Sequence, residues 1–370
     1  MATVKLKIAE LRKDKGIGQQ DLANVLGVSF QSVSKWETGT TMPDISLLPD
    51  IARYFNISVD ELLGLQPLHQ RQYIPSNTDN HDTSNGKENN IYKNRKYFWN
   101  EDYLHFLVNN VWKVEAPADF IEFRCCEGYF GQQLLNILPK GSTYTGVDNK
   151  YFTDISKQRF TDSNHATEFI ASDLYDFGTL KKYDMAIIQV GLRHMNRPLE
   201  VLRQMIASVK KGGLVICIDV NREFENDGLY IDCLDYNYLC NTFDFHEIWK
   251  KELECEGRDY AIGMRLPFYM RQLGLRDVDV RVNDRVDFVN INKQDYKQEV
   301  QDFIDIHGLD KSYNVSDCEV TIEYLMNRGV NREQAEAYIK KQGKVAEYFK
   351  SKENKSFLHV QGLLITYGRK

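Results

Sequence analysis

Two aspartates that follow separate apolar runs are the residues best placed to bind a small molecule. Asp148 ends the run Thr143–Val147, and Asp173 comes soon after Glu168–Ala171. Both runs have the composition of short strands. A carboxylate at a strand end, about 20 residues beyond a glycine-containing turn, takes the hydroxyls of a ribose. Asp148 has this spacing from the turn Arg124–Gly128. The pattern predicts a ligand with a ribose at Asp148 and a base next to Asp173.

These aspartates need a parallel sheet to bring them together. Strands are expected at 120–123, 143–147, 168–171, 183–189, 214–219 and 278–286, and helices at 99–112, 129–138, 198–209 and 262–275. Regular alternation of strand and helix indicates parallel strands joined by crossover helices. In such sheets, ligands bind outside the carboxyl ends of the strands. Both aspartates are expected at that edge.

A separate, all-helical domain is expected before residue 66. Its five short helices are predicted at 4–14, 19–26, 30–37, 45–55 and 58–63. Gly27 follows the second helix, where a residue that tolerates positive φ is favoured. Ser29 can cap the third helix by accepting a hydrogen bond from a free backbone N–H. Val33 and Trp36 are expected to face the core, which turns the other side of the third helix outward.

The segment LANVLGVSFQSVSKWETG resembles the Cro-like phage-repressor (XRE) helix-turn-helix family, and the resemblance covers residues 4–65. It implies that 30–36 is a recognition helix in the major groove of double-stranded operator DNA. Gly18 departs from the family, which usually has Thr as the helix cap at this position. The residues implied to contact bases or phosphates are Gln19, Ser29, Phe30, Gln31, Ser34 and Lys35. The alternative reading of these positions is a solvated helix face.

Composition bounds the class of protein. The 370 residues are 42% hydrophobic and 27% charged, with a net charge of −6, so bulk positive charge does not attract this chain to nucleic acid. The seven cysteines have no metal-ligand spacing and are expected to be reduced thiols in a cytoplasmic protein. No apolar run approaches the ~20 residues of a membrane span. Residues 66–96 lack apolar periodicity and are expected to be a flexible linker.

The second half of the chain resembles the class I S-adenosylmethionine-dependent methyltransferases over 97–290 and 357–370. The motifs that carry the resemblance are TGVD at 145–148, ASDL at 171–174, YDMAIIQVGLRHM at 183–195, SVKKGGLVICID at 208–219 and the terminal FLHVQGLLITYGRK. The resemblance implies a Rossmann-like α/β domain at 97–370 with a seven-stranded sheet. Its last strand, 357–370, is implied to run antiparallel at the sheet edge, after a helical insertion at 291–356.

The resemblance also implies a cofactor, S-adenosylmethionine or S-adenosylhomocysteine, and no metal. Asp148 is implied to bind the ribose, and Asp173 with Ser172 and Leu174 the adenine. The full set of implied cofactor contacts is Glu122, Arg124, Cys126, Gly128, Asp148, Asn149, Ser172, Asp173, Leu174, Gln189 and Val190. His194 has the family's common His position after the fourth strand. A structural or substrate-shaping role for it is favoured over catalysis, so the catalytic residues stay unknown.

The first turn departs from the family pattern. Where the family has Glu/Asp-x-Gly-x-Gly-x-Gly, this chain has Glu122-Phe-Arg124-Cys-Cys126-Glu-Gly128, so two of three glycines are replaced. Those glycines let the backbone approach a cofactor without a Cβ. Arg124 is expected in or beside the methionine site, paired with a carboxylate of the cofactor or of Glu122. The turn therefore predicts altered or weak cofactor binding, or a different ligand.

Two functions fit this combination. The first is a transcriptional regulator whose methyltransferase-like domain senses S-adenosylmethionine or another metabolite. The second is an active small-molecule methyltransferase that also represses its own operon. A DNA methyltransferase is disfavoured, because Gln189-Val-Gly-Leu follows the fourth strand where an Asn/Asp-Pro-Pro-aromatic motif would be needed. A homodimer is expected, since one small domain with seven basic and eight acidic residues in 1–65 offers little affinity for DNA alone.

Overall fold

The computed structural model describes residues 6–55, 57–65, 75, 98–220, 228–311, 313–351 and 356–370. The chain divides into two compact units, which are described separately. The first consists of Met1–Ser76, Asn241–Lys251 and Ser312–Val345, and the second of Asn77–Cys240, Glu252–Lys311 and Ala346–Lys370. Apart from residue 75, the predicted linker 66–96 lies outside the described residues.

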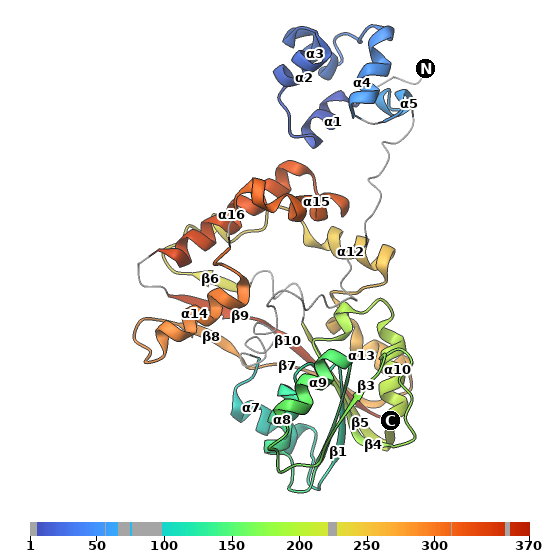
Figure 1. Cartoon of the computed structure of the whole chain (residues 1–370), viewed down its shortest axis with the longest axis vertical. Helices are drawn as coiled ribbons and strands as arrows, with labels where there is room; N and C mark the ends of the chain where they lie inside the picture. Colours follow the sequence, from blue (N-terminus) through green and yellow to red (C-terminus); the bar gives the residue numbers. More distant parts are fainter. Residues whose placement is uncertain are drawn as a thin grey trace. The chain divides into compact units, whose positions relative to one another are not determined.

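The N-terminal helices form a small bundle (Figure 1, blue). They are α1 (Ile8–Asp14), α2 (Gln19–Leu26), α3 (Phe30–Glu37), the 3-10 helix η1 (Ile45–Leu47), α4 (Leu48–Phe55) and α5 (Val59–Leu62). The predicted bounds of α2 and α3 are confirmed. Gly27 ends α2 with a φ of 65°, and the Ser29 hydroxyl oxygen accepts a hydrogen bond from the Ser32 N–H over 3.1 Å. The side chains of Val33 and Trp36 are buried in the bundle, as predicted.

The first unit also contains helices from later in the chain. They are most of α12 (Phe245–Glu256), the 3-10 helix η6 (Val315–Cys318), α15 (Glu319–Asn327) and most of α16 (Arg332–Lys350). Tyr338 of α16 packs its ring 5.6 Å from that of Phe243 and 5.9 Å from that of Phe245, measured between centroids. Arg332 forms an ion pair with Glu319 over 2.8 Å. Together with α14 below, these helices confirm the predicted helical character of 291–356.

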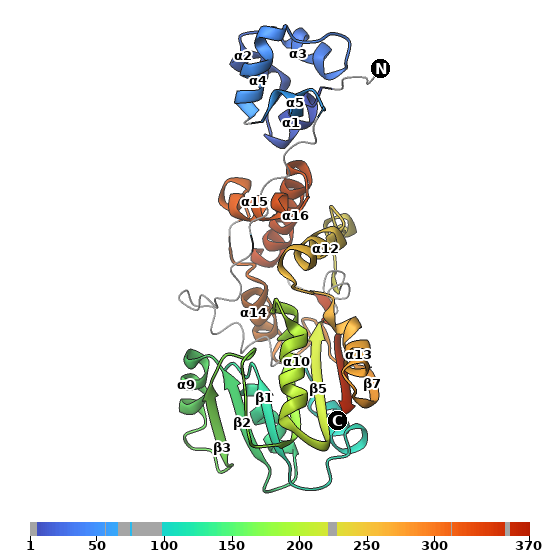
Figure 2. The same ribbon diagram turned by 90° about the vertical axis from the view of Figure 1, so that its right-hand side faces the viewer.

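A seven-stranded sheet is the centre of the second unit (Figure 2). Its strands are β1 (Asp119–Phe123), β2 (Thr143–Asp148), β3 (Thr167–Ala171), β4 (Tyr183–Gln189), β5 (Val209–Val220), β7 (Arg276–Val282) and β10 (Leu363–Arg369). Their order is β3-β2-β1-β4-β5-β10-β7. The first five are parallel, and β10 is antiparallel to both of its neighbours. The predicted Rossmann-like sheet is confirmed.

Helices cover both faces of this sheet, because both faces of its central strands are apolar. On one face lie α7 (Glu101–Phe106), its π-helical continuation η3 (Leu107–Val111) and α8 (Tyr129–Ile137). On the other lie α10 (Pro198–Ser208) and α13 (Ile262–Gln272). Helix α9 (Lys150–Arg159) follows β2, and the 3-10 helix η4 (Leu192–His194) follows β4.

Two expected strands were wrong in their bounds and position. The C-terminal segment 357–370 forms two strands, β9 (Phe357–Val360) and β10, and β10 lies between β5 and β7 rather than at the edge. The expected strand 278–286 likewise divides into β7 and β8 (Val286–Val289). Gly362, with a φ of 61°, turns the chain between β9 and β10. The Asn283 side-chain oxygen accepts the Leu363 N–H over 2.9 Å, just after β7 ends and where β10 begins.

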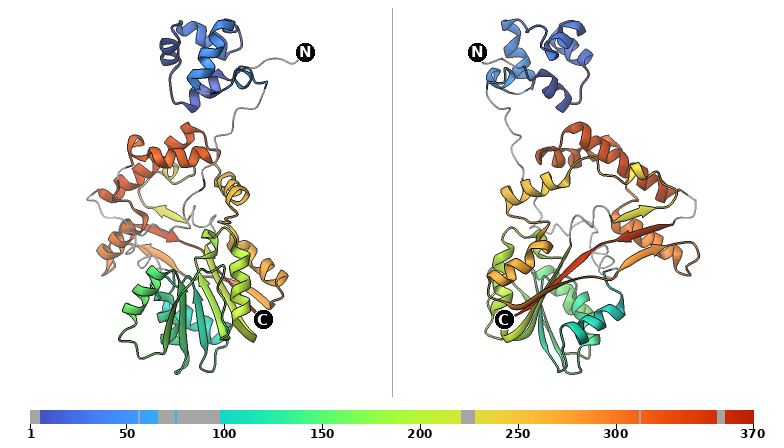
Figure 3. Two further views of the ribbon diagram at one scale, coloured as in Figure 1. Left: turned by 45° about the vertical axis from the view of Figure 1, so that its right-hand side comes forward. Right: turned by 180° about the vertical axis from the view of Figure 1, so that it is seen from behind.

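The outer strands form a second, three-stranded antiparallel sheet in the order β6-β9-β8, with β6 spanning Leu229–Ile231 (Figure 3). Helix α14 (Tyr296–His307) packs on it through Phe303, whose ring centroid is 4.4 Å from that of Phe357. The 3-10 helix η5 (Tyr236–Tyr238) follows β6. Among the helices of the described ranges, none has the length and apolarity to span a membrane.

Candidate functional site

The turn between β1 and α8 has three residues with positive φ, and two of them are not glycine. Arg124, Cys126 and Gly128 have φ values of 55°, 50° and 72°. This left-handed region costs a residue with a Cβ roughly 1–2 kcal/mol, which is why glycine is usual there. Strained residues of this kind cluster at functional sites, where the surrounding structure holds them in place. The turn therefore has the backbone conformation that glycine favours at two positions that carry side chains.

Hydrogen bonds from β2 and α9 hold the turn. The Cys126 N–H donates to Oδ2 of Asp148 over 2.8 Å, and the Cys126 carbonyl accepts from the Ser156 hydroxyl over 2.8 Å. The Cys125 N–H donates to the Val147 carbonyl over 3.2 Å. The predicted ribose ligand Asp148 thus lies directly against the turn, at the carboxyl end of β2.

Asp148 is the point at which several of the predicted residues meet. Its side chain is nearly buried, and Oδ1 accepts the Asn149 N–H over 2.7 Å. Its backbone carbonyl accepts the Ser172 N–H over 3.0 Å, which joins the ends of β2 and β3. Asn149 uses its own side-chain oxygen to cap α9, by accepting the Phe152 N–H over 3.0 Å. A carboxylate oxygen accepts two hydrogen bonds, so these contacts are compatible with a ligand hydroxyl at Asp148.

Asp173 and Leu174 follow Ser172 at the end of β3. Asp173 is exposed, and its Oδ1 accepts the Tyr175 N–H over 2.9 Å, which shapes the loop. Leu174 is half-buried against the apolar cluster under α10 and α13. Residues 172–174 therefore lie next to Asp148, and the two carboxylates differ in that Asp148 is nearly buried and Asp173 is exposed.

Arg124 connects the first turn to the residues after β4. Its Nη1 donates to the Gly191 carbonyl over 2.9 Å. A Cβ at Gly191 would lie 3.3 Å from Cδ of Arg124 and 2.7 Å from the Ile188 side chain, so the two loops approach closely. Val190, between β4 and this glycine, has a φ of 48°, and its N–H donates to the Ile218 carbonyl over 2.7 Å. The Arg124 side chain therefore crosses the space beside which Val190 was predicted to bind the ligand.

Three other predicted residues have supporting positions. Glu122 is fully buried, and its Oε2 accepts the Tyr144 hydroxyl over 2.7 Å and the Gly131 N–H over 3.1 Å, which fixes the start of α8 on the sheet. Gln189 is fully buried at the end of β4. His194 is half-buried, with its ring centroid 6.0 Å from that of Tyr260.

The sequence reasoning missed a buried charged group at the end of β5. Asp219 has no exposed surface, and its oxygens accept the N–H groups of Val220 over 3.0 Å and Arg193 over 3.3 Å. Burial raises the pKa of Asp219 to about 6, against the opposing charges of Arg193 and Arg124. The signal was the position of Asp219 at a strand end, inside a motif used only for its strand.

The loop before α13 adds further buried charge near His194. Arg258 has no exposed surface, and its guanidinium contacts Glu256 over 2.5 Å and donates to the Tyr260 hydroxyl over 3.0 Å. The Arg193 guanidinium carbon lies 5.6 Å from the centroid of the Tyr260 ring. The sequence predicted no function for these residues, because only the folded chain brings Arg193 close to Arg258 and Tyr260.

In the first unit, α3 presents most of the residues predicted to contact DNA. Ser29, Phe30, Gln31 and Lys35 are exposed, and Ser34 is half-buried. Phe30 keeps 42% of its surface exposed, so its ring is accessible on the outer face of α3.

Gln19 has a different environment, in a buried ion pair that connects the first three helices. Arg12 of α1 holds Glu37 of α3 through two bonds, Nε to Oε1 over 2.5 Å and Nη2 to Oε2 over 3.0 Å. Nε2 of Gln19, at the start of α2, donates to Oε2 of Glu37 over 2.7 Å. Burial acts to raise the pKa of Glu37, but the hydrogen bonds from Arg12 and Gln19 lower it below its ordinary value overall. This group of three, which we call the Arg12–Glu37–Gln19 clamp, fixes the orientation of α3.

Comparison with known proteins identifies the N-terminal domain. Residues 8–62 match the family model described as helix-turn-helix. The HTH-type transcriptional activator BcrR of Enterococcus faecalis is 39% identical over 62 residues, which are 17% of this chain and 30% of that protein. The HTH-type transcriptional regulator YazB of Bacillus subtilis (strain 168) is 38% identical over 56 residues, 15% of this chain and 81% of that protein. The chain belongs to the helix-turn-helix family of transcriptional regulators.

The chain carries a second domain, which matches another family. Residues 121–217 match the family model described as a methyltransferase domain. Among solved structures, the plantazolicin methyltransferase BpumL in complex with SAH is 14% identical, over 78% of this chain and 91% of that chain, with a TM-score of 0.40. The two family models and the observed strand order confirm the predicted combination of an XRE-type head and a methyltransferase fold.

Proposed function

We propose that this chain is a DNA-binding transcriptional regulator whose methyltransferase domain binds S-adenosylmethionine or S-adenosylhomocysteine and acts as a metabolite sensor. The observation that carries the proposal is the first turn. Its residues Arg124, Cys126 and Gly128 have the positive φ that glycine favours, while the side chain of Arg124 extends to the Gly191 carbonyl and occupies space that a glycine would leave open. We expect the turn to accept a nucleoside, while the Arg124 side chain reduces the space for a methyl acceptor. This combination favours ligand binding over methyl transfer.

The residues at the carboxyl ends fit an adenosine. The backbone of 124–128 would lie along the nucleoside, Asp148 would accept the ribose hydroxyls, and Ser172 to Leu174 would border the base. When bound, S-adenosylmethionine supplies an electrophilic methyl group. Asp148 and the backbone of the turn would orient the ligand, and the Arg124 guanidinium would lie towards the end that carries the methionine.

Calorimetry of the full-length protein with S-adenosylmethionine and S-adenosylhomocysteine tests this site. Asp148→Ala should weaken binding by about 1.5–3 kcal/mol, because it removes a charge-assisted hydrogen bond. Asp176→Ala, at an exposed position after β3, is the matched control and should leave affinity unchanged. Equal affinity in both variants would refute the site, and the absence of any binding to the wild type would point to a different metabolite.

DNA recognition is proposed to reside in residues 1–65, with α3 in the major groove. The exposed amide of Gln31 suits bidentate contact with adenine, and the exposed ammonium of Lys35 suits guanine or phosphate. Phe30 offers an apolar contact for a thymine methyl. Ser29, at the N-terminus of α3, and Gln19, at that of α2, lie at helix ends that favour phosphate.

A homodimer is proposed to read two half-sites about 34 Å apart. A row of exposed apolar side chains on the outer face of the small sheet supports it. Leu358 pairs in register with Tyr230 on one side and Phe288 on the other, and all three are exposed. Because soluble proteins seldom leave such a row open, a second copy of the chain is the occupant we propose. Light scattering that shows only monomer, with and without DNA, would refute it.

Ligand binding is proposed to change operator affinity through the dimer. With a linker predicted at 66–96, a rigid lever between the DNA-binding and ligand-binding parts is not expected. The segment 291–356 is the candidate contact that alternates between two arrangements. A coupling free energy on the order of 1–3 kcal/mol is typical of such systems.

The second candidate function is an active small-molecule methyltransferase that also represses its own operon. The intact order of the seven-stranded sheet favours it. Methyl transfer depends mainly on in-line positioning, so the lack of an assigned general base does not exclude turnover. Transfer of a labelled methyl group to a small molecule by the purified protein would support this function over the sensor.

A further inference from the structure

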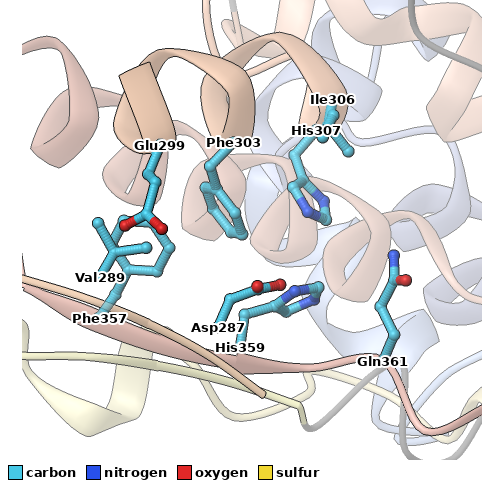
Figure 4. A pocket seen from close by; sticks show the side chains of 9 residues that line it. All are labelled: Asp287, Val289, Glu299, Phe303, Ile306, His307, Phe357, His359 and Gln361. Atoms are coloured by element: carbon cyan, nitrogen blue, oxygen red, sulfur yellow. The ribbon is translucent and has the colours of Figure 1, made fainter. Parts of the chain in front are cut away.

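A pocket separate from the candidate nucleotide site lies in the second unit, between α14 and the small sheet (Figure 4). It encloses about 380 Å³ of empty space, including some that is open to solvent. None of its lining residues belongs to the first turn or to the strand ends at Asp148 and Asp173.

The regular geometry of one helix and two paired strands builds the walls. Glu299, Phe303 and His307 are spaced four residues apart on α14, so they form one stripe of that helix. Asp287 of β8 and His359 of β9 are direct partners across the antiparallel ladder, and both face the helix. The alternation of the strands turns their neighbours Phe288 and Leu358 to the opposite face.

Aromatic rings enclose the pocket. The ring centroid of Phe303 lies 4.2 Å from that of His307 and 5.3 Å from that of His359. The two imidazole centroids are 5.1 Å apart, and Phe357 closes the inner end 4.4 Å from Phe303. Aromatic faces attract cations through the ring quadrupole.

The charged groups in the wall have one sign. The lining residues that the structure describes include two carboxylates, Asp287 and Glu299, and neither Lys nor Arg. Arg285 pairs with Asp287 over 2.6 Å and Lys293 with Glu299 over 3.0 Å, and neither cation lines the pocket. Burial raises the pKa of Asp287 in spite of Arg285, so a further cation would stabilise its ionised form.

Gln361 adds a hydrogen-bond acceptor at the end of the pocket nearest β10. Its Oε1 is buried and accepts no hydrogen bond from the part of the chain that the structure describes. Gln361 comes two residues before Leu363, which pairs with Val220 at the carboxyl end of β5. The pocket therefore lies beyond the same edge of the large sheet at which Asp148 and Asp219 end their strands.

We propose that this pocket binds a small organic ammonium ion that carries an apolar or aromatic group. The two carboxylates would attract the ammonium, the Gln361 oxygen would offer a hydrogen-bond acceptor at the opposite end of the pocket from Glu299, and the apolar part would pack against Phe303 and Phe357. A metal ion is not supported, because no group of three or more His, Cys, Asp or Glu among the described residues could hold one. The inference is independent of the proposed nucleotide site, since the two share no residues.

Three probes of one shape and different charge test the proposal on the full-length protein. They are 2-phenylethylamine, 2-phenylethanol and phenylacetate, titrated by ligand-observed NMR or calorimetry. The amine should bind at least about tenfold more tightly than the alcohol, and the acid most weakly. Glu299→Gln and Asp287→Asn should each weaken amine binding by about 3- to 30-fold with little effect on the alcohol.

The controls separate charge from folding and from the nucleotide site. Asp305→Asn removes a carboxylate from the same helix at a position that does not line the pocket, and it should leave amine binding unchanged. Phe303→Leu should weaken both the amine and the alcohol. S-adenosylmethionine titration of each variant reports on the other site independently. Equal affinity for all three probes, no binding of the amine at millimolar concentration, or amine binding unchanged by both carboxylate variants would overturn the proposal.

Discussion

Replacement of Glu37 by glutamine tests whether the Arg12–Glu37–Gln19 clamp holds the recognition helix. Glu37 accepts two bonds from Arg12 and one from Gln19, and these three residues lie on three different helices. The introduced glutamine would keep the size of the side chain but lose its charge, and its NH₂ group would face the donors of Arg12 or Gln19. One donor of a partly buried pair would then be left without an acceptor.

The magnitude follows from the burial of the pair. The side chains of Arg12 and Glu37 are only 13% and 7% exposed. Exposed ion pairs contribute about 0.2–1 kcal/mol, and breaking a fully buried pair costs about 3–5 kcal/mol. We therefore expect Glu37→Gln to cost about 2 kcal/mol of helix-turn-helix stability, between these two limits. The matched control is Glu10→Gln on α1, whose partner Lys7 is 34% exposed, and it should cost about 0.5 kcal/mol or less.

Hydrogen exchange measured by mass spectrometry on the full-length protein reports on α3 directly. A loss of 2 kcal/mol corresponds to about 30-fold faster exchange of its most protected amides. The lowered pKa of Glu37 means that its contribution is present above its unfolded value near 4.5 and is lost as pH falls through its folded value. The wild type should therefore lose protection below about pH 4.5, and Glu37→Gln should lack that step. Equal exchange in Glu37→Gln and Glu10→Gln would refute the reasoning.

Three further outcomes are expected. Gln31→Ala and Lys35→Ala should each weaken operator binding by about 1–3 kcal/mol in gel shifts, and unchanged affinity and sequence preference in both would contradict the placement of α3. Arg124→Gly removes a positive charge, so it should raise the affinity for the cationic S-adenosylmethionine relative to S-adenosylhomocysteine by about fivefold or more. Arg124→Lys keeps the charge and should keep the wild-type ratio of the two affinities, which calorimetry measures. Because burial raises the pKa of Asp219 to about 6 from 3.8, its ionisation destabilises the fold as pH rises through that window. Asp219→Asn should therefore stabilise the protein to urea by about 2 kcal/mol at pH 7.5 and by little at pH 4; equal stabilisation at both values would show that Asp219 does not titrate in this way.

Local signals made the helix-turn-helix readable from the sequence. Gly27 and Ser29 define the turn between α2 and α3 through backbone conformation and capping, and both effects depend only on neighbouring residues. The ends of the strands near Asp148 and Asp219 could also be predicted from the sequence, because each short apolar run stops at a polar residue. What the sequence could not show was the conformation of Arg124 and Cys126. Non-glycine residues rarely adopt positive φ, so composition alone suggested a changed loop where the structure has the positive φ that glycine favours.

The pocket under α14 was beyond sequence reasoning for a different reason. Its residues come from segments near 287, 299–307 and 357–361, and only the second sheet brings them together. That sheet depends on the breaks at Asn283 and Gly362, which divide two runs that read as continuous strands. The segment 228–260, with its buried Arg258, shows no periodicity strong enough to predict its elements. Contacts of this kind are set by tertiary packing, not by local pattern.

Coupling between the two halves is the central claim, and operator binding with and without ligand tests it most directly. An operator obtained by selection on the full-length protein would be titrated in the absence and presence of saturating S-adenosylmethionine at fixed salt. The account predicts a change in operator affinity of about 5- to 150-fold, and by reciprocity the operator must change the affinity for the ligand by the same factor. Identical titration curves in the two conditions would contradict the account and leave a methyltransferase fold that happens to carry a DNA-binding domain.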